Sequence, residues 1–272
     1  MKAADLFKVK DFGVVVTGGA SGIGLGYTEA LAENGARVTM LDVNRERIDR
    51  EVQRLRGAGL DVRGAVADVT DHDALDLAVD EAAHHYVRLD VAFANAGIDP
   101  GIGFTTRDGK RLPAGAIENY EDERWNQVID INLNGVFATI RAAARHMRPR
   151  KFGRIIVTTS VASMRVGTGI GMAYMAAKAG AAHLMRNAAL ELAADGITVN
   201  GIAPGSFATN IGGGWLKDPK AQEEVAARVP MHRVATPSDM AGLALFLASP
   251  ASSYVTGQNI AIDGGMLLGS VE

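Results

Sequence analysis

Tyr174 and Lys178 are the two residues whose types and spacing most directly suggest a reaction. They stand four positions apart in a stretch with a helical pattern, so their side chains lie on one face within reach of one another. A free tyrosine has a pKa near 10 and is a poor base at neutral pH, but a neighbouring ammonium favours the phenolate. Lowering that pKa by roughly 3 units takes about 4 kcal/mol, which one close cation in a partly desolvated cleft can supply. The pair therefore suggests proton transfer at a substrate oxygen.

A glycine-rich turn from Thr17 to Gly24 follows a short apolar run and opens a helical pattern. The glycines at Gly18, Gly22 and Gly24 allow the backbone to turn tightly and to approach a pyrophosphate, whose charge the N–H groups of a helix N-terminus stabilise. The spacing is not G-x-G-x-x-G, because Tyr27 occupies the last position. Taken alone, the turn could equally be structural.

Asp42 ends the second apolar run, 18 residues after Gly24. At this place in a dinucleotide-binding unit an acidic side chain accepts hydrogen bonds from the adenosine ribose hydroxyls. A 2′-phosphate would meet an uncompensated carboxylate there, so Asp42 favours NAD over NADP. Asp42 could instead, or in addition, cap a helix that starts at Asn44.

These residues need a scaffold, and the pattern of the chain supplies one. Short apolar runs alternate with helical patterns from end to end, which predicts βαβ units that build a parallel sheet covered on both faces. We expect one doubly wound α/β domain of the Rossmann type over residues 1–272. A helix over Gly22–Asn34 should end at a left-handed Gly35, and another should span Asp71–Tyr86. The seven predicted strands are Gly13–Thr17, Arg37–Asp42, Asp61–Ala67, Asp90–Asn95, Arg154–Thr159, Thr198–Ala203 and Gln258–Ile262.

Two segments lack clear periodicity, Ile98–Glu118 and Ser206–Pro230. Both follow strand ends, where open α/β sheets bind their ligands, so we expect both to be long loops and candidate lids. In the first, Gly101, Gly103, Gly109 and Gly115 predict flexibility.

Several motifs in a fixed order resemble the short-chain dehydrogenase/reductase family, and together they cover nearly the whole chain. The resemblance implies a Rossmann-type fold and hydride transfer between a nicotinamide cofactor and a secondary alcohol or ketone. The motifs are Thr17 to Gly24, Asn95-Ala96-Gly97, Asn132 within Ile131 to Gly135, Ser160 at a strand end, Tyr174-Met175-Ala176-Ala177-Lys178, Pro204-Gly205, Val255 to Gln258 and Asp263 to Gly265.

The resemblance implies a role for each matching residue. Tyr174 would be the general acid/base, and Lys178 would lower its pKa and hold the nicotinamide ribose. Ser160 would hydrogen-bond the reacting oxygen, and Asn132 would hold a water in a proton relay to Lys178. The implied cofactor contacts are Gly18, Ser21, Gly22, Ile23 and Gly24 at the pyrophosphate, Asp42 and Val43 at the ribose, Asp68 and Val69 at the adenine, Asn95, Ala96 and Gly97 in the middle of the groove, and Pro204, Gly205, Phe207 and Thr209 at the nicotinamide end.

The chain departs from the pattern of NADP-dependent family members, which often carry Arg or Lys where Ser21 and Val43 stand. We therefore expect NAD as the cofactor, with Arg45 as the nearby cation that could accept a phosphate instead. An NADPH-dependent ketone reductase of the 3-oxoacyl type is the alternative within the enzyme class. A catalytically silent nucleotide-sensing protein on the same fold is the alternative outside it. The interval before Asn132 is longer than in the family, so no role is carried over to Asp99–Glu118.

The residues expected at the substrate are mostly apolar and predict a neutral, cyclic or aromatic alcohol rather than a charged acid. An anionic substrate remains an alternative, because four cations stand near the expected pocket: Arg107, Lys110, Arg111 and Arg165. The expected substrate residues are Ser160, Val161, Ala162, Ile170, Tyr174, Phe207, Ile211 and Trp215.

Composition limits the partners. A net charge of −3, from 28 basic and 31 acidic residues, gives no electrostatic basis for binding nucleic acid. There is no cysteine, and the six histidines lack the spacing of metal ligands, so we expect no metal. No apolar run approaches the roughly 20 residues of a membrane span, and we expect a cytoplasmic protein.

The helix predicted over Tyr174–Ala194 is apolar almost all round and should be covered by the sheet and by a partner. The family resemblance implies a homotetramer with two-fold interfaces on such helices.

Overall fold

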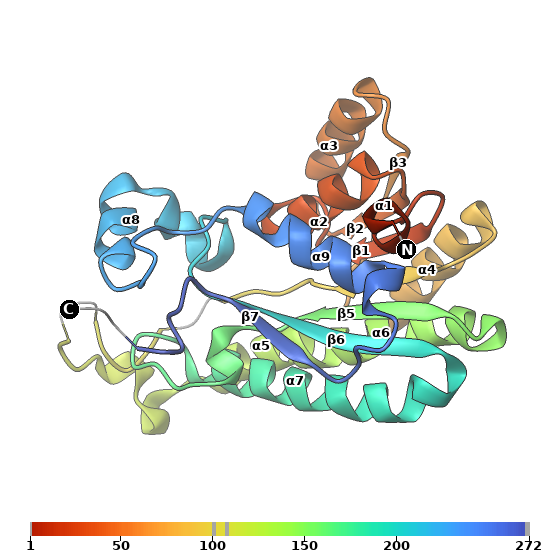
Figure 1. Cartoon of the computed structure of the whole chain (residues 1–272). Helices are drawn as coiled ribbons and strands as arrows, with labels where there is room; N and C mark the ends of the chain where they lie inside the picture. Colours follow the sequence, from red (N-terminus) through yellow and green to blue (C-terminus); the bar gives the residue numbers. More distant parts are fainter. Residues whose placement is uncertain (1, 100–101, 107–108, 270–272) are drawn as a thin grey trace.

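Seven parallel strands form one sheet in the order β3-β2-β1-β4-β5-β6-β7 (Figure 1). The computed structural model describes residues 2–99, 102–106 and 109–269. Every predicted strand is confirmed, with each end within one residue of its predicted position. The strands are β1 Gly13–Thr17, β2 Arg37–Asp42, β3 Val62–Val66, β4 Val91–Ala94, β5 Gly153–Thr158, β6 Ile197–Pro204 and β7 Asn259–Ile262.

The strand order reverses beside β1, and this reversal positions the site. β1 pairs with β2 on one side and with β4 on the other, with Val14 opposite Val38 and Val91 respectively. The connections that leave β1 and β4 therefore diverge to opposite faces, which opens a crevice at the carboxyl ends of these strands.

Helices cover both faces of the sheet (Figure 1). α2, α3 and α9 lie on one face, and α4, α6 and α7 lie on the other. The helices are α1 Ala3–Leu6, α2 Gly22–Glu33, α3 Arg45–Gly57, α4 His72–Tyr86, α5 Asp122–Ile129, α6 Gly135–Met147, α7 Met172–Leu192, α8 Pro219–Ala226 and α9 Ala241–Ala248.

The core follows from the alternation of side chains along the strands. Val14 and Val16 of β1 pack in the same cluster as Leu31 of α2, whereas Val15 points to the other face and packs in the cluster of Leu75 of α4. All five residues of β1 are buried, because a strand in the middle of a parallel sheet is covered on both sides. This buried strand holds the glycine-rich turn at a fixed place.

The predicted helix ends are largely confirmed. Gly35 adopts a left-handed φ of 83° directly after α2, and the side chain of Asp71 caps α4 by accepting a hydrogen bond from the N–H of Ala74 at 3.0 Å. α7 begins and ends two residues earlier than the predicted Tyr174–Ala194, since a 3-10 turn takes over at Ala193. None of the helices in the described residues is both long and apolar enough to cross a membrane.

The prediction that Ser206–Pro230 is a loop was wrong. It contains a 3-10 segment, Ile211–Lys217, and the helix α8. Asp218 caps α8 by accepting from the N–H of Ala221 at 2.9 Å, and Pro219 occupies the first helical position. This Asp-Pro pair is a helix start signal that could have been read from the sequence.

The segment Ile98–Glu118 is largely irregular, as predicted, but its glycines serve packing. A Cβ atom on Gly103 would lie 2.2 Å from the carbonyl oxygen of Thr168, and one on Gly115 would lie 2.1 Å from that of Gly103. Gly109 has a positive φ of 79° in a turn closed by the bridge between Thr105 and Arg111. The described part of this loop is therefore packed against the segment that leads into α7. Gly101 and Arg107 lie outside the described residues.

Candidate active site

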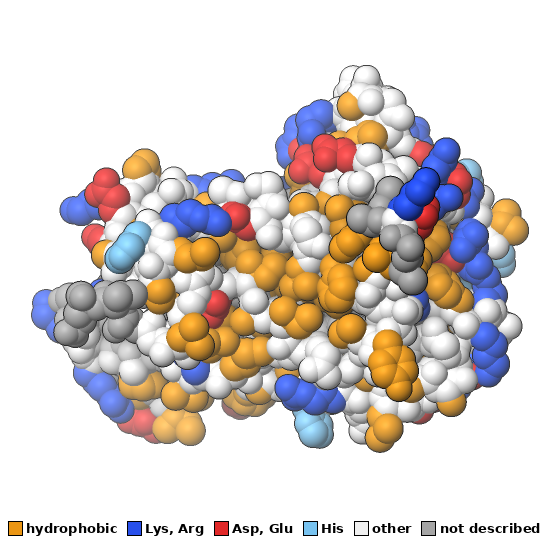
Figure 2. Space-filling view, viewed as in Figure 1, with side chains coloured by type: hydrophobic (Ala, Val, Ile, Leu, Met, Phe, Trp, Pro, Cys, Tyr) orange, Lys and Arg blue, Asp and Glu red, His pale blue; other side chains and the backbone are white. Residues whose placement is uncertain are grey.

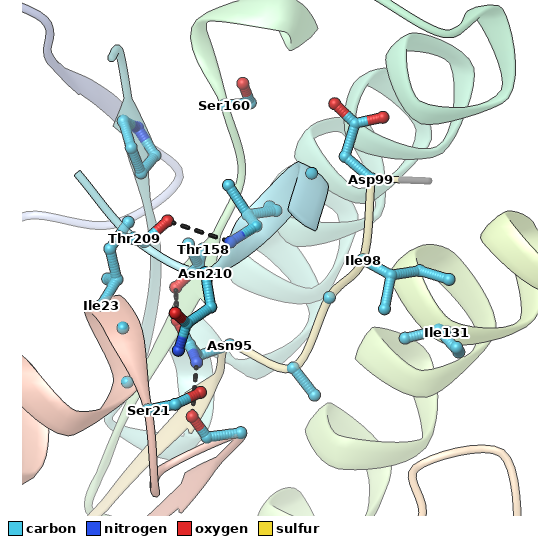
Figure 3. A pocket seen from close by; sticks show the side chains of 18 of the residues that line it. Ser21, Ile23, Asn95, Ile98, Asp99, Ile131, Thr158, Ser160, Thr209 and Asn210 are labelled. Atoms are coloured by element: carbon cyan, nitrogen blue, oxygen red, sulfur yellow. Dashed lines mark hydrogen bonds between the residues drawn. The ribbon is translucent and has the colours of Figure 1, made fainter. Parts of the chain in front are cut away.

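A cavity of about 720 Å³ opens at the carboxyl edge of the sheet. The turn after β1 lines it together with residues that follow β4, β5 and β6, as the strand order requires. In Figure 3, Ser21, Ile23, Thr209 and Asn210 lie on one side of this pocket, and Ile98 and Ile131 lie on the other.

The glycine-rich turn has the geometry of a phosphate cradle. Gly18 and Gly22 adopt positive φ values of 64° and 55°. A Cβ atom on Gly24 would lie 2.1 Å from the carbonyl oxygen of Gly18, so no side chain fits there. Ser21 precedes α2 and makes no capping hydrogen bond with its side chain, which leaves the first N–H groups of the helix open to an anion.

Asn95 ties this turn to the next strand. Its backbone N–H donates to the Oγ1 of Thr17 at 3.0 Å, and its side-chain amide donates to the carbonyl oxygen of Thr17 at 2.9 Å. The Oγ1 of Thr158 donates to the Oδ1 of Asn95 at 3.0 Å (Figure 3). Asn95 thus fixes the ends of β1, β4 and β5 relative to one another.

Asp42 lines the cavity near the glycine-rich turn, with 8% of its surface exposed. Its two carboxylate oxygens accept hydrogen bonds from the backbone N–H groups of Ala20 at 3.3 Å and Asn44 at 3.1 Å. The capping alternative for Asp42 was wrong, because Asn44 caps α3 through the N–H of Arg47 at 2.8 Å. The carboxylate is therefore held in place beside the phosphate turn.

The cation at this end is Arg47 rather than Arg45. Arg47 lines the cavity, whereas Arg45 pairs with Asp49 at 3.6 Å, and both of those side chains are exposed. The two positions differ because α3 starts at Arg45 and turns its third residue toward the cavity.

Ser160 and Tyr174 come together at the opposite end of the cavity. Ser160 follows β5, and its Oγ accepts from the N–H of Ala162 at 3.1 Å. The two side chains are almost fully buried, at 7% and 9% exposure. Burial raises the pKa of the Tyr174 hydroxyl, a hydrogen bond with Ser160 opposes this, and the carboxylate of Asp99 adds to it. Tyr174 is thus protonated at neutral pH in the free protein, and the prediction that its pKa is lowered was wrong for this state because burial dominates.

Lys178 lies one helical turn after Tyr174 on α7 and is only 2% exposed. Its Nζ donates to the carbonyl oxygen of Thr158 at 2.8 Å and lies 5.7 Å from the centre of the Tyr174 ring. Burial lowers the pKa of Lys178 to about 8, and Asp99 opposes this shift. Lys178 is therefore mostly protonated at neutral pH and can lose its proton just above it.

Asn132 sits in a π-helical turn, Asp130–Asn134, that interrupts the helical run between α5 and α6. Its side-chain amide donates to the carbonyl oxygens of Ile98 at 2.9 Å and Val128 at 3.1 Å, while its Oδ1 is buried and accepts no hydrogen bond within the described residues. That Oδ1 and the Nζ of Lys178 lie 2.7 and 3.3 Å from the place where Gly97 would carry a Cβ atom. Both groups thus face one small space that only a glycine leaves open.

Most of the predicted site residues line this one cavity. They are Gly18, Ser21, Gly22, Ile23, Gly24, Asp42, Val43, Asp68, Val69, Asn95, Ala96, Gly97, Ser160, Tyr174, Lys178, Pro204, Gly205, Phe207, Thr209 and Ile211.

The structure does not bring four expected substrate residues to the cavity lining. Ala162 packs into a cluster with Ala173 and Tyr174, and Ile170 packs against that cluster. Val161 is 7% exposed and buried, and Trp215 is 40% exposed on the 3-10 segment Ile211–Lys217. Their places depend on how the turns after β5 and β6 fold back, which strand-end position alone does not fix.

Sequence reasoning also missed residues that line the cavity. Asp99 and Arg47 bring charge, and the others are mainly small, apolar or amide side chains. For Arg47 the cap at Asn44 was a usable signal, whereas the rest carry no motif. These residues are Arg47, Ala67, Ile98, Asp99, Gln127, Ile131, Thr158, Thr159, Asn210, Gly212 and Gly213.

The residues present fit a nicotinamide dinucleotide. The turn that excludes a Cβ atom at Gly24 accommodates a pyrophosphate, and the Asp42 carboxylate can accept from a ribose diol. Asn132, which was predicted in the catalytic set, does not itself line the cavity and reaches only the space beside Gly97. The His, Asp and Glu side chains of the described residues form no group of three that could hold a metal ion.

Comparison with known proteins agrees with this geometry. Residues 18–267 match a family model described as enoyl-(acyl carrier protein) reductase. The chain is 40% identical to cis-4-hydroxycyclohexanecarboxylate dehydrogenase of Sinomonas cyclohexanicum, over 92% of this chain and 94% of the relative. It is 36% identical to the 3-oxoacyl-(acyl-carrier-protein) reductase of Thermotoga maritima, over 93% and 97% of the two chains.

A solved structure shares the whole architecture. The gluconate 5-dehydrogenase of Burkholderia cenocepacia, in complex with NADP and tartrate, superimposes with a TM-score of 0.86 at 32% identity and covers 98% of this chain and 99% of its own.

Proposed function

The chain belongs to the short-chain dehydrogenase/reductase family, an oxidoreductase family that acts on CH–OH groups, and we propose that it uses NAD to interconvert a secondary alcohol and a ketone. The single observation that carries this proposal is that Ser160, Tyr174 and Lys178 line the same cavity as the glycine-rich turn, Thr17 to Gly24.

Each of these side chains has a task in alcohol oxidation. Bound NAD supplies the acceptor for the hydride that leaves the carbinol carbon. In its phenolate form Tyr174 takes the hydroxyl proton on its Oη, so that one C–H and one O–H bond of the substrate break and one O–H bond of Tyr174 forms as the ketone is made. The Oγ of Ser160 donates a hydrogen bond to the reacting oxygen and holds it beside Tyr174.

Lys178 acts before the proton transfer and Asn132 after it. Protonated Lys178 stabilises by its charge the Tyr174 phenolate that accepts the proton, since its Nζ lies 5.7 Å from the ring centre. The buried Oδ1 of Asn132 and the Nζ of Lys178 face one space beside Gly97. We expect a water held there to carry the proton toward the solvent.

NAD is the cofactor that the adenosine end favours. A 2′-phosphate bound beside Asp42 would face its carboxylate, and exposed Val43 contributes no cation. The presence of Arg47 in the cavity favours a second candidate function, the NADPH-dependent reduction of a ketone of the 3-oxoacyl type. The Thermotoga relative is named as a 3-oxoacyl-(acyl-carrier-protein) reductase. The balance between Asp42 and Arg47 thus decides the cofactor.

A cytoplasmic homotetramer is the assembly that we propose. A groove between α6 and α7 is lined by apolar residues such as Ile140, Ala144, Leu184 and Ala188, with Phe137 45% exposed at its side. In Figure 2 hydrophobic side chains also gather over β7 and α9. A tetramer with dihedral symmetry needs two different two-fold interfaces, and we propose these two surfaces for them.

A panel of neutral secondary alcohols, tested with NAD and with NADP, examines the proposal. We expect the absorbance of the reduced cofactor to rise with NAD and at least one cyclic alcohol. Ketones tested with NADH and NADPH address the second candidate. Turnover with any pair excludes the silent nucleotide-sensing alternative, and its absence from the whole panel would contradict the proposed enzyme.

A further inference from the structure

Asn259 stands at the start of β7, the edge strand of the sheet, directly opposite Gly201 of β6. Its half-buried side chain passes over that glycine toward the end of β5, which lies beyond β6 (Figure 1). Neighbouring strands lie about 4.8 Å apart, so β5 and β7 are separated by about 9.6 Å. A Cβ atom on Gly201 would lie 2.5 Å from the Oδ1 of Asn259, so the side chain can cross β6 only because a glycine stands there.

The Oδ1 of Asn259 is held by the end of β5. It accepts a hydrogen bond from the Oγ1 of Thr159 at 2.7 Å, and that Oγ1 also lies 3.0 Å from the carbonyl oxygen of Ile202. Thr159 is 1% exposed and directly follows the last residue of β5. Because the Oδ1 faces Thr159, the amide nitrogen of Asn259 is free to face the segment that comes after it.

That segment is the 3-10 turn Val161–Ser163, which follows Ser160. The Nδ2 of Asn259 donates to the Oγ of Ser163 at 3.2 Å, and this Oγ donates to the carbonyl oxygen of Ser160 at 2.6 Å. The hydroxyl of Ser163 has one proton and gives it to Ser160, so toward Asn259 its oxygen acts as the acceptor. The hydrogen bonds therefore run in one direction, from Asn259 through Ser163 to the backbone of Ser160.

The position of this turn decides where the Ser160 hydroxyl points. The Oγ of Ser160 accepts from the N–H of Ala162 at 3.1 Å, which leaves its own proton for the reacting oxygen. A 3-10 turn of three residues has poor hydrogen-bond geometry, so its orientation depends on contacts with its surroundings. Asn259 supplies such a contact from the far side of β6.

We propose that Asn259 is a positioning residue for Ser160: through Ser163 it fixes the 3-10 turn so that the Ser160 hydroxyl donates to the reacting oxygen. Asn259 does not line the cavity and acts from behind it. The inference rests on the proposed function. A misplacement of about 1 Å at an aligned reacting group can cost about 10² in rate, so a contact outside the cavity is enough to affect turnover.

The proposal has a consequence for the pH profile. Burial raises the pKa of the Tyr174 hydroxyl, and the hydrogen bond with Ser160 opposes this rise. If Ser160 turns away, the phenolate forms only at higher pH, and the acid limb of kcat/KM for alcohol oxidation moves to higher pH. Among the described residues, Lys178, Asp99 and Tyr120 are the other titratable groups around Tyr174, and a substitution of Asn259 alters none of them.

The first test is the variant Asn259→Leu of the full-length enzyme. It removes the donor to Ser163 at nearly constant volume, while the hydroxyl of Thr159 keeps the carbonyl oxygen of Ile202. We expect kcat to fall about tenfold and the acid limb to move to higher pH. The melting temperature and the affinity for NADH, measured by its fluorescence, should stay unchanged.

Double variants show whether the effect passes through the proposed residues. Ser163→Ala removes the intermediate hydroxyl and should lower kcat as Asn259→Leu does, and the two substitutions together should cost no more than one of them. In a Ser160→Ala enzyme, Asn259→Leu should change the residual kcat by less than about twofold. Ser163→Thr keeps the donating hydroxyl and should retain most of the activity.

Gln258→Leu is the matched control. It makes a similar change from an amide to an apolar side chain at the preceding, exposed position, where the Nε2 reaches the carbonyl oxygen of Thr256 instead of Ser163. We expect its kcat and pH profile to equal those of the unaltered protein. An unchanged kcat in Asn259→Leu overturns the proposal. A loss that persists in full in the Ser160→Ala enzyme, or that comes with lower NADH affinity and a lower melting temperature, also overturns it.

Infrared spectroscopy separates this inference from the proposed function. Cyclohexanone with an isotopically labelled carbonyl is bound to the enzyme–NAD complex, where no hydride is available to reduce it. A hydrogen bond from Ser160 lowers the stretching frequency of the carbonyl group. A frequency that rises in Asn259→Leu toward the value in Ser160→Ala supports the inference even if no alcohol is oxidised, in which case the proposed function alone fails. Equal frequencies in Asn259→Leu and the unaltered protein overturn the inference even if alcohols are oxidised.

Discussion

Asp42 can be tested as the residue that selects NAD over NADP. Two substitutions distinguish the effect of its negative charge from that of the hydrogen bonds it accepts. Its carboxylate oxygens accept hydrogen bonds from the backbone N–H groups of Ala20 and Asn44, and Arg47 lines the same end of the cavity. Asp42→Ala removes both the charge and the bulk, and Asp42→Asn removes the charge alone. We expect each variant to shift the preference from NAD toward NADP, with the larger shift for Asp42→Ala.

The magnitude follows from two contributions. A hydrogen bond to a charged group contributes about 1.5 to 3 kcal/mol, so losing the carboxylate weakens the hold on the ribose of NAD. Two unit charges 4 Å apart interact with about 4 kcal/mol at an effective dielectric constant near 20. Val43 beside Asp42 is 63% exposed, so solvent reduces the repulsion of a 2′-phosphate to about 1 to 2 kcal/mol. The sum of about 2.5 to 5 kcal/mol changes the ratio of the two kcat/KM values by a factor of roughly 10² to 10³ or more.

Steady-state kinetics with NAD and NADP at one fixed alcohol concentration measures that ratio. The unaltered enzyme should prefer NAD at least tenfold, or by about 1.4 kcal/mol. Adding Arg47→Met to Asp42→Ala should remove the gain for NADP, because the phosphate then loses its cation. The melting temperatures of the variants show whether losing the hydrogen bonds from the N–H groups of Ala20 and Asn44 destabilises the fold. A preference of the unaltered enzyme for NADP, or an unchanged ratio in both Asp42 variants, would refute the reasoning.

Three further outcomes follow from the site and its surroundings. Tyr174→Phe should lower kcat by about 10² to 10⁴ while NADH binds as before, and near-normal turnover would rule out Tyr174 as the acid/base. Replacing residues 100–113 by a short Gly/Ser turn should keep the fold and the NAD affinity but raise the substrate KM or change substrate choice, because Gly103 packs on Thr168 beside the site; unchanged kinetics and oligomeric mass would make the loop a tolerated insertion. Light scattering at micromolar concentration should give the mass of a tetramer, and Ala188→Arg in the groove between α6 and α7 should split it, whereas a stable monomer would contradict the assembly.

The sequence predicted those parts of the site that local order along the chain determines. A turn that follows a buried strand and precedes a helix has its direction fixed by both neighbours, so the positions of Gly18 and Ser21 could be derived. Tyr174 and Lys178 are similarly fixed relative to one another, because they stand four positions apart on one helix. The position of Arg47 could not be derived in the same way. To predict whether Arg45 or Arg47 faces the cavity, one must know at which residue α3 begins, and the capping side chain of Asn44 determines that.

The position of Asp99 could not be predicted from the residues next to it in the sequence. Its place results from contacts between segments distant in the chain, since Asn132 holds the carbonyl oxygen of Ile98 at 2.9 Å and the following loop packs on Thr168. The hydrogen bond from Asn132 has a second consequence. The π-helical turn that leaves its Oδ1 toward Lys178 also directs its amide at the carbonyl oxygen of Ile98, so one side chain positions both the space beside Lys178 and the start of the loop that lines the cavity. The proposed proton path and this part of the cavity wall therefore share a support, and substitutions of Asn132 should disturb both together.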